Sequence, residues 1–141
     1  MYDKAFQGLK GIAKLPVNTL ERENAYWWYP ITLDLDALTT DAQGVLKALS
    51  AQKIPCYGIQ WPEAYEEKAY KEMNGFGTAQ FPFHSKEYTA ENLSYENILC
   101  PVAKSLRAKT VNLFLHPTWE ETHIRRVIEA FTAVLADYTK A

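Results

Sequence analysis

The clearest periodic pattern of the chain lies near its end, where apolar residues recur three and four positions apart. They are Ile124, Val127, Ile128, Phe131, Val134, Leu135 and Tyr138. This spacing places all seven on one stripe of an α-helix. Thr118 and Glu121 have the spacing of a capping box, which predicts that the helix begins beside them. We therefore expect a long final helix that buries its stripe in the core.

Two segments alternate between apolar and polar positions, which is the pattern of half-buried strands. In the segment 26–35 the predicted core face carries Trp27, Tyr29, Ile31, Leu33 and Leu35, and the second face carries Tyr26, Trp28, Pro30, Thr32 and Asp34. In the segment 110–115 the core face carries Val111, Leu113 and Leu115, and the second face carries Asn112 and Phe114. Large exposed aromatic side chains favour association, so we expect the second face to meet another domain or a partner.

Weaker patterns predict the remaining elements. The chain opens with a predicted helix that has Ala5, Phe6, Leu9 and Ile12 on one stripe, and a second helix capped by Thr40 and Gln43 is followed by a strand at 54–59. A helix is predicted at 63–73, with a solvated acidic face of Glu63, Glu66 and Glu67. Another helix is predicted to begin at Pro101 and to direct Val102, Ala103 and Leu106 inward. Residues 76–97 read as a long irregular loop, and such loops are usually functional or disordered. This order predicts an α/β sandwich of two layers, with about three strands and helices on one face.

Composition narrows the function classes. With 141 residues the chain fits one domain. Its net charge of -2 does not suggest a basic surface that would bind nucleic acid or an anionic membrane. No apolar run approaches the roughly 20 residues that span a bilayer. The first residues lack the apolar core of a signal peptide, so we expect a cytoplasmic protein. They look like the middle of a helix, which suggests a split gene or a piece of a longer protein.

The metal-ligating residue types show no pattern of a metal site. Cys56 and Cys100 are far apart, and we expect both to be buried free thiols. The 3 histidines, His84, His116 and His123, form no pair at helical spacing with a carboxylate. We expect His116 to orient the turn before Pro117, and His123 to lie on the solvent side of the final helix.

Several motifs carry a resemblance to a known enzyme family. The segment 100–131 reads as Cys-Pro-Val-Ala, a strand ending in Leu-His-Pro, and a final helix. Two further motifs precede this segment: Tyr29-Pro30-Ile31, and a helix that runs into a strand over residues 46–54. This order resembles the C-terminal part of the pyridoxal-phosphate-dependent sugar aminotransferases of the DegT/DnrJ/EryC1/StrS group. The resemblance covers nearly the whole chain.

The resemblance implies a fold and an activity. The fold would be the small domain of such an enzyme, a mostly antiparallel sheet with helices on one face, over residues 1–141, with residues 1–24 as linking helix and connector. The parent enzyme would use pyridoxal phosphate to aminate a keto-sugar or keto-cyclitol, and it would be a homo-oligomer such as a dimer. Its cofactor lysine would lie in a larger domain or subunit that this chain lacks, so we expect the chain alone to bind no cofactor.

The loop after the second predicted strand suggests the substrate contacts. In the family this loop often reads Tyr-x-Pro-x-His and contacts the sugar substrate near the cofactor, and here residues 57–65 contain no histidine. We single out Tyr57, Gln60, Trp61, Tyr65 and His84 as candidate substrate-binding residues. The aromatic rings either stack on a sugar ring or pack against the neighbouring loop. His84 either binds a substrate hydroxyl or satisfies a loop carbonyl.

No residue shows the context of a catalytic group. No lysine lies in a recognisable cofactor motif, and no serine or cysteine shows a nucleophile motif. Two functions therefore stay open from the sequence. The chain is either the non-catalytic small domain of an aminotransferase, or a stand-alone binding or interaction module derived from that fold.

Overall fold

The computed structural model describes residues 1–86, 95 and 97–141. They divide into two compact units, one of residues 1–60 with 106–141 and one of residues 61–105. We describe each unit by itself and call them the sheet unit and the 61–105 unit. The single domain expected over residues 1–141 stays a prediction. No helix among the described residues has both the length and the apolar character needed to cross a membrane.

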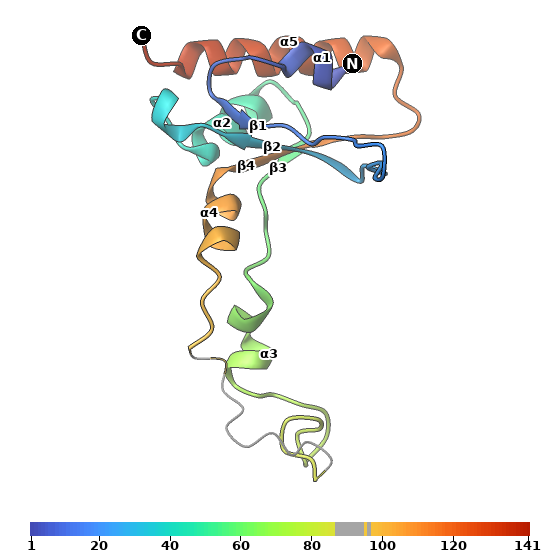
Figure 1. The fold of residues 1–141 in the computed structure, drawn as a ribbon, viewed down its shortest axis with the longest axis vertical. Helices are drawn as coiled ribbons and strands as arrows, with labels where there is room; N and C mark the ends of the chain where they lie inside the picture. Colours follow the sequence, from blue (N-terminus) through green and yellow to red (C-terminus); the bar gives the residue numbers. More distant parts are fainter. Residues whose placement is uncertain (87–94, 96) are drawn as a thin grey trace. The chain divides into compact units, whose positions relative to one another are not determined.

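The sheet unit is built on four antiparallel strands in the order β1-β2-β4-β3 (Figure 1). The strands are β1 (Ile12–Lys14), β2 (Trp28–Leu33), β3 (Cys56–Tyr57) and β4 (Thr110–Phe114). The central pair aligns Ile31 with Val111 and Tyr29 with Leu113. The expected two-layer α/β fold with an antiparallel sheet is therefore confirmed. The fourth strand, β1, lies where the opening helix was expected to continue.

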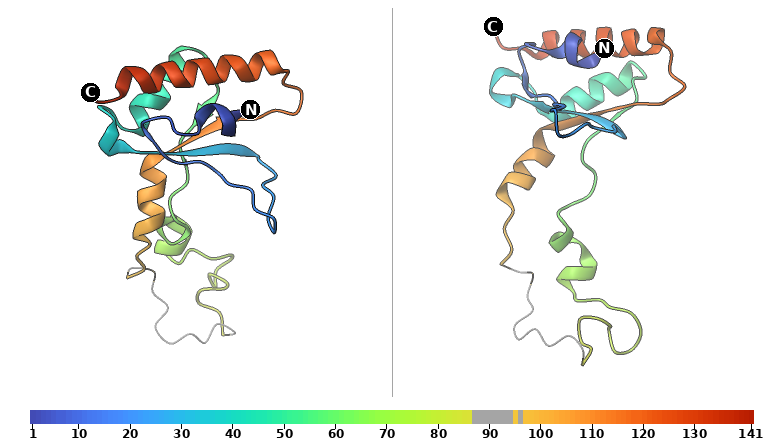
Figure 2. Two further views of the ribbon diagram at one scale, coloured as in Figure 1. Left: turned by 45° about the horizontal axis from the view of Figure 1, so that its top comes forward. Right: turned by 45° about the vertical axis from the view of Figure 1, so that its right-hand side comes forward.

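Three helices lie on one face of this sheet: α1 (Tyr2–Phe6), α2 (Ala42–Ala51) and α5 (Glu121–Tyr138) (Figures 1 and 2). A 3-10 turn at Leu35–Ala37 links β2 to α2. The core between the layers is apolar, and its largest fully buried side chains include Phe6, Ile31, Leu33, Leu113 and Phe131. The rings of Phe6 and Phe131 pack with centroids 4.9 Å apart. The stripe predicted for the final helix is confirmed as the main contribution of α5 to this core.

The alternation predicted for residues 26–35 is correct in the strand and wrong before it. Tyr29, Ile31 and Leu33 are buried as expected. Trp27, expected on the core face, is 76% exposed, while Tyr26, expected on the second face, packs against the core. The reason is local: β2 begins only at Trp28, and Tyr26 has a φ of 45°, in the left-handed region. This turn reverses the direction of the side chain, so the period of two does not extend to residue 26.

The capping residues predicted from sequence lie one residue before the observed cap of α2 and two residues before the observed cap of α5. The side chain of Asp41, not Thr40, caps α2 by accepting from the Gly44 amide at 2.8 Å. Glu120, not Thr118, caps α5, and His123 accepts from the Glu120 amide at 3.2 Å. His123 is therefore part of the cap and not only a surface residue. Asp41 is as good a capping residue as Thr40, so the motif alone does not select the position at α2. Glu120 is not a preferred capping type and caps α5 through the box that it forms with His123.

Other elements are shorter or more exposed than expected. The strand expected at 54–59 reduces to β3, and the helix expected at 63–73 splits into a 3-10 turn (Ala64–Glu66) and a single helical turn, α3 (Lys68–Lys71). The helix α4 (Pro101–Lys109) forms as predicted, but Val102 on it is 70% exposed. Cys56 is buried as expected, whereas Cys100 is exposed.

The 61–105 unit has a small aromatic cluster of its own. The rings of Tyr70, Phe83 and Tyr95 meet edge to face, with centroids 5.3 to 6.3 Å apart. Phe76 and Phe81 pair through two backbone hydrogen bonds, so this part of the predicted loop 76–97 is a short hairpin-like turn. Residues 87–94 and 96 of that loop lie outside the described residues.

Candidate functional site

The 61–105 unit contains a pocket of about 380 Å³ that joins aromatic, charged and aliphatic side chains. It is lined by Tyr65, Glu66, Lys71, Tyr95, Ile98, Leu99 and Lys104. The 3-10 turn supplies Tyr65 and Glu66, α3 supplies Lys71, and the first turn of α4 supplies Lys104. Residues far apart in sequence therefore converge on one pocket, which makes it the candidate site of this unit.

An ion pair organises one wall of this pocket. The Nζ atom of Lys104 donates to a carboxylate oxygen of Glu66, whose side chain is only 20% exposed. The hydrogen bond with Glu66 is the main cause that raises the pKa of Lys104 above its usual value. The same Nζ lies 6.0 Å from the centroid of the Tyr65 ring, within the range of a cation–π contact. The lysine is therefore held as a cation beside a fixed carboxylate.

Tyr65 is fixed from its other end. Its hydroxyl oxygen accepts a hydrogen bond from the backbone N–H of Cys100 at 3.2 Å. Its hydroxyl hydrogen stays available as a donor. A rigid aromatic ring beside a charged donor and a charged acceptor is suited to a polyhydroxylated ligand, because sugar hydroxyls both donate and accept.

The structure places only one of the five predicted substrate residues, Tyr65, in this pocket. Trp61 is 68% exposed. His84 is exposed, and its backbone N–H donates to the Gln80 carbonyl at 3.3 Å. Gln60 is exposed at the end of a sheet-unit segment, and Tyr57 lies in β3. Their roles in substrate binding stay predictions.

Sequence reasoning missed most of the residues that line the pocket. Glu66 was expected on a solvated helix face, but the helix breaks there and its carboxylate pairs with Lys104. Lys71 and Lys104 carry no motif, and their common position depends on how the chain returns after the loop. The available signal was Pro101, which correctly predicted the start of α4 and so the position of Lys104 in its first turn.

A second feature is an aromatic cluster on the face of the sheet opposite α1, α2 and α5. The ring of Trp28 meets the rings of Tyr57 and Phe114 edge-on, with centroids 4.9 and 5.4 Å away. Phe114 in turn meets Trp119 at 5.8 Å. Trp28, Phe114 and Trp119 are partly exposed, and Tyr57 is 42% exposed. We call these four residues the sheet-face cluster.

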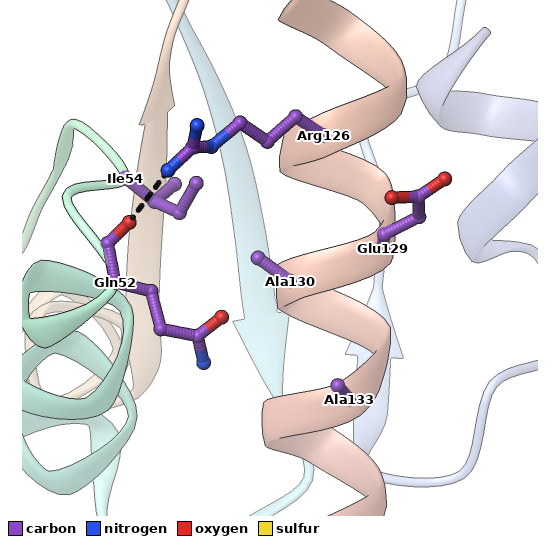
Figure 3. A pocket seen from close by; sticks show the side chains of 6 residues that line it. All are labelled: Gln52, Ile54, Arg126, Glu129, Ala130 and Ala133. Carbon is purple, nitrogen blue, oxygen red and sulfur yellow. Dashed lines mark hydrogen bonds between the residues drawn. The ribbon is translucent and has the colours of Figure 1, made fainter.

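A larger groove of about 490 Å³ lies between the end of α2 and α5 (Figure 3). Arg126 donates to the backbone carbonyl of Gln52 at 3.4 Å. Figure 3 shows Glu129 on the other side of the helix from Gln52 and Ile54, so the charged groups do not converge. Ala130 and Ala133 add only small apolar side chains to its lining. The groove is large, but its polar groups do not point towards a common position, so we assign it no role.

The residues that are present do not fit an internal Schiff base with pyridoxal phosphate. Such a lysine needs a desolvated setting to lower its pKa. Every lysine lies in the described part of the chain, and none is buried. Among the described residues no group of three or more potential ligands could hold a metal ion.

Comparison with known proteins identifies the fold. No family model matches the chain, and no curated protein matches it. A solved structure, the aminotransferase TlmJ from Streptoalloteichus hindustanus, matches 96% of this chain with a TM-score of 0.64 at 18% sequence identity. The chain spans 29% of the length of that protein. The chain therefore has the fold of a segment of an aminotransferase.

Proposed function

We propose that this chain is the C-terminal small domain of a pyridoxal-phosphate-dependent aminotransferase of the DegT/DnrJ/EryC1/StrS type, acting on a keto-sugar or keto-cyclitol. The observation that carries the proposal is the fold likeness to an aminotransferase over 96% of the chain. The order of the Tyr-Pro-Ile and Leu-His-Pro motifs along the chain supports the narrower family. In this proposal the domain shapes the substrate cleft and supplies no catalytic group.

The pocket of the 61–105 unit is the proposed place of substrate contact. Tyr65 offers a ring face and a hydroxyl donor, while Glu66 and Lys104 offer a charged acceptor and a charged donor. Sugar hydroxyls hydrogen-bond to such groups, and the apolar side of a sugar ring packs on aromatic rings. Tyr57, Gln60, Trp61 and His84 stay further candidates.

Pyridoxal phosphate belongs, in this proposal, to a larger domain or subunit outside the chain. When bound, the cofactor supplies the electron sink for amino transfer. No lysine of this chain is buried, which supports a cofactor lysine located elsewhere. We propose that the sheet-face cluster meets the larger domain, and that the complete enzyme is a cytoplasmic homo-oligomer.

Borohydride reduction in the presence of pyridoxal phosphate tests this assignment. The reading frame upstream of this chain is cloned, and its product is reduced alone and together with this chain. We expect the pyridoxyl label on one lysine of the upstream product and no site-specific label on this chain, by mass spectrometry of peptides. A stoichiometric label on one lysine of this chain would contradict the proposal.

Transamination of keto-sugars by the combined parts tests the substrate class. Lys104→Met removes the charge beside Tyr65 and is expected to raise KM more than it lowers kcat. Lys47→Met, on an exposed position of α2, is the matched control. Equal activity of both variants would remove the pocket from the proposal without touching the aminotransferase assignment.

The alternative function is a stand-alone binding or interaction module with this fold. The observation that favours it is that the pocket and the sheet-face cluster are both formed by this chain alone. An upstream frame that encodes no cofactor-binding domain would select this alternative.

A further inference from the structure

The 61–105 unit has no buried core of its own. None of the residues of this unit that the structure describes is buried, whereas the sheet unit packs an apolar core between its two layers. The rings of Tyr70, Phe83 and Tyr95 contact one another, but each of them is still partly open to solvent. Folding must offset the conformational entropy of every ordered residue, and the burial of apolar surface is the main term that does so. The unit therefore lacks the stabilisation that its own order requires.

Large apolar side chains of this unit are open to solvent instead. Phe76 is 86% exposed and Leu99 is 78% exposed, and Phe81 and Val102 are exposed as well. Single exposed apolar residues are normal on a protein surface, but several of them on a unit without a core are typical of a surface that another protein covers. We call Phe76, Phe81, Leu99 and Val102 the arm residues.

Local backbone bonds hold two of the arm residues on one turn. The Phe76 N–H donates to the Phe81 carbonyl at 2.7 Å, and the Phe81 N–H donates to the Phe76 carbonyl at 3.0 Å. Directly opposite residues of such an antiparallel pair have their side chains on the same face. The Gly75 N–H donates to the side-chain oxygen of Gln80 at 2.8 Å, and a Cβ atom at Gly75 would lie 2.1 Å from the Gln80 carbonyl oxygen. The sequence thus builds a closed turn that presents two phenylalanine rings on one face.

Leu99 connects the arm residues with the pocket of the 61–105 unit. It lines this pocket together with Ile98, Tyr65 and Lys104, yet most of its side chain is open to solvent. A substrate held beside Tyr65 and Lys104 reacts only if it also reaches the cofactor, which the proposed function assigns to a larger domain or subunit. Under that assignment the exposed edge of the pocket at Leu99 has to face that part of the enzyme.

The fold likeness indicates which protein covers the arm residues. The likeness covers 96% of this chain, too much to leave out the 61–105 unit, and only 29% of the aminotransferase. Most of the length of that aminotransferase therefore lies outside the matched segment, in the part that would hold the cofactor under the proposed function.

We propose that the 61–105 unit is a docking arm for the cofactor-binding part of the enzyme, and that it becomes stably ordered when this part covers the arm residues. The surface that receives the arm is apolar, because none of the four arm side chains carries a charge or a polar group. The arm is a second contact with that part, separate from the sheet-face cluster. The proposal rests on the proposed function and adds a surface through which the chain binds the larger domain or subunit.

Calorimetric titration of the full chain with the product of the upstream reading frame tests the arm. Leu99→Ser and Phe76→Ser are each expected to weaken binding at least about tenfold, because each removes an apolar side chain that is buried on association. Leu20→Ser is the matched control, since Leu20 is a fully exposed leucine of the sheet unit, and it should bind like the parent chain. All three variants should keep the urea midpoint of the parent chain, because these side chains are exposed in the isolated chain.

Amide hydrogen exchange measures the ordering of the arm. In the isolated chain we expect peptides from residues 61–86 and 97–105 to exchange at least about tenfold faster than peptides from β2, β4 and α5. Addition of the upstream product should slow the exchange of the arm peptides. Equal protection of the two units in the isolated chain, or unchanged exchange of the arm in the complex, would overturn the proposal.

The outcomes distinguish the arm from the proposed function. If the parent chain binds the upstream product and both Leu99→Ser and Phe76→Ser bind it equally tightly, the arm is wrong and the aminotransferase assignment stands. If the two variants lose self-association but keep this binding, the arm residues form an interface between copies of the chain, which also overturns the proposal. If the upstream product carries no cofactor lysine, the proposed function fails and the docking arm fails with it.

Discussion

At the scale of single residues, the buried tyrosines decide how the fold responds to pH. Tyr2 is almost completely buried, and burial raises its pKa to about 12. In an unfolded chain a tyrosine ionises near pH 10. Between these values the unfolded state has lost the proton and the folded state keeps it. Stability is therefore fully present below about pH 10 and declines as pH rises towards 12.

We predict that the free energy of unfolding falls steadily from about pH 10 upward, and that Tyr2→Phe makes this fall shallower. The variant removes the ionisable hydroxyl and also an unpaired buried group, so at neutral pH its stability should be unchanged or slightly higher. Urea titrations of both chains at about pH 8 and pH 11 measure this. Parallel losses in both chains would show that Tyr2 does not contribute to the pH dependence.

At the scale of elements, the apolar stripe predicted for α5 is buried, whereas the one predicted for α4 is exposed. On α5 the predicted stripe includes Phe131, which is fully buried against Phe6. On α4 the predicted inward residues include Val102, which is 70% exposed. The difference is length, because five turns of α5 span the whole sheet, whereas two turns of α4 give too few positions to define a face.

The consequence for stability is specific. Phe131→Ala is expected to cost on the order of 3 kcal/mol, through the loss of buried ring contacts and the cavity that remains. Val102→Ala is the control on α4 and should change stability by less than about 0.5 kcal/mol. Denaturant titrations compare the two. A loss of under about 1 kcal/mol for Phe131→Ala would place this ring outside the core.

The caps give a second element-scale prediction. Asp41→Ala removes the side chain that accepts from Gly44 N–H and is expected to cost about 1 kcal/mol. Thr40→Ala removes the residue that the sequence motif favours and should cost clearly less. Thermal unfolding of the two variants ranks them. The reverse order would restore the cap that the sequence predicted.

Some of these features could be predicted from the sequence, and others could not. The core residues of β2 and β4 were predictable, because each strand follows a period of two over five or six residues. The antiparallel pairing came from the family resemblance, because the order of the elements alone would also allow a small parallel sheet. The placement of Tyr26 was not predictable, because one left-handed residue reverses a side chain without a glycine or asparagine to signal it. The pocket around Lys104 and Glu66 was not either, because its residues come together only through the fold of residues 61–105.

At the scale of the whole molecule, the sheet unit has two unlike faces. One is covered by α1, α2 and α5 (Figure 2). The other carries the sheet-face cluster of Trp28, Tyr57, Phe114 and Trp119, whose rings contact one another edge to face. Edge-to-face packing fixes these rings as one aromatic surface. Such a surface on a partly exposed sheet face is typical of a contact with a partner.

We therefore predict weak self-association of the isolated chain through the sheet-face cluster. Trp28→Thr keeps a residue suited to a strand and removes the ring at the centre of the cluster, so it should shift the monomer–dimer equilibrium towards monomer by at least about tenfold. Trp61→Thr removes an equally large ring from the other unit, where Trp61 is 68% exposed, and should leave the equilibrium unchanged. Sedimentation velocity over a concentration series measures both variants. If the parent chain stays monomeric at all concentrations, or if Trp61→Thr has the larger effect, the sheet-face cluster is not the surface through which the chain associates.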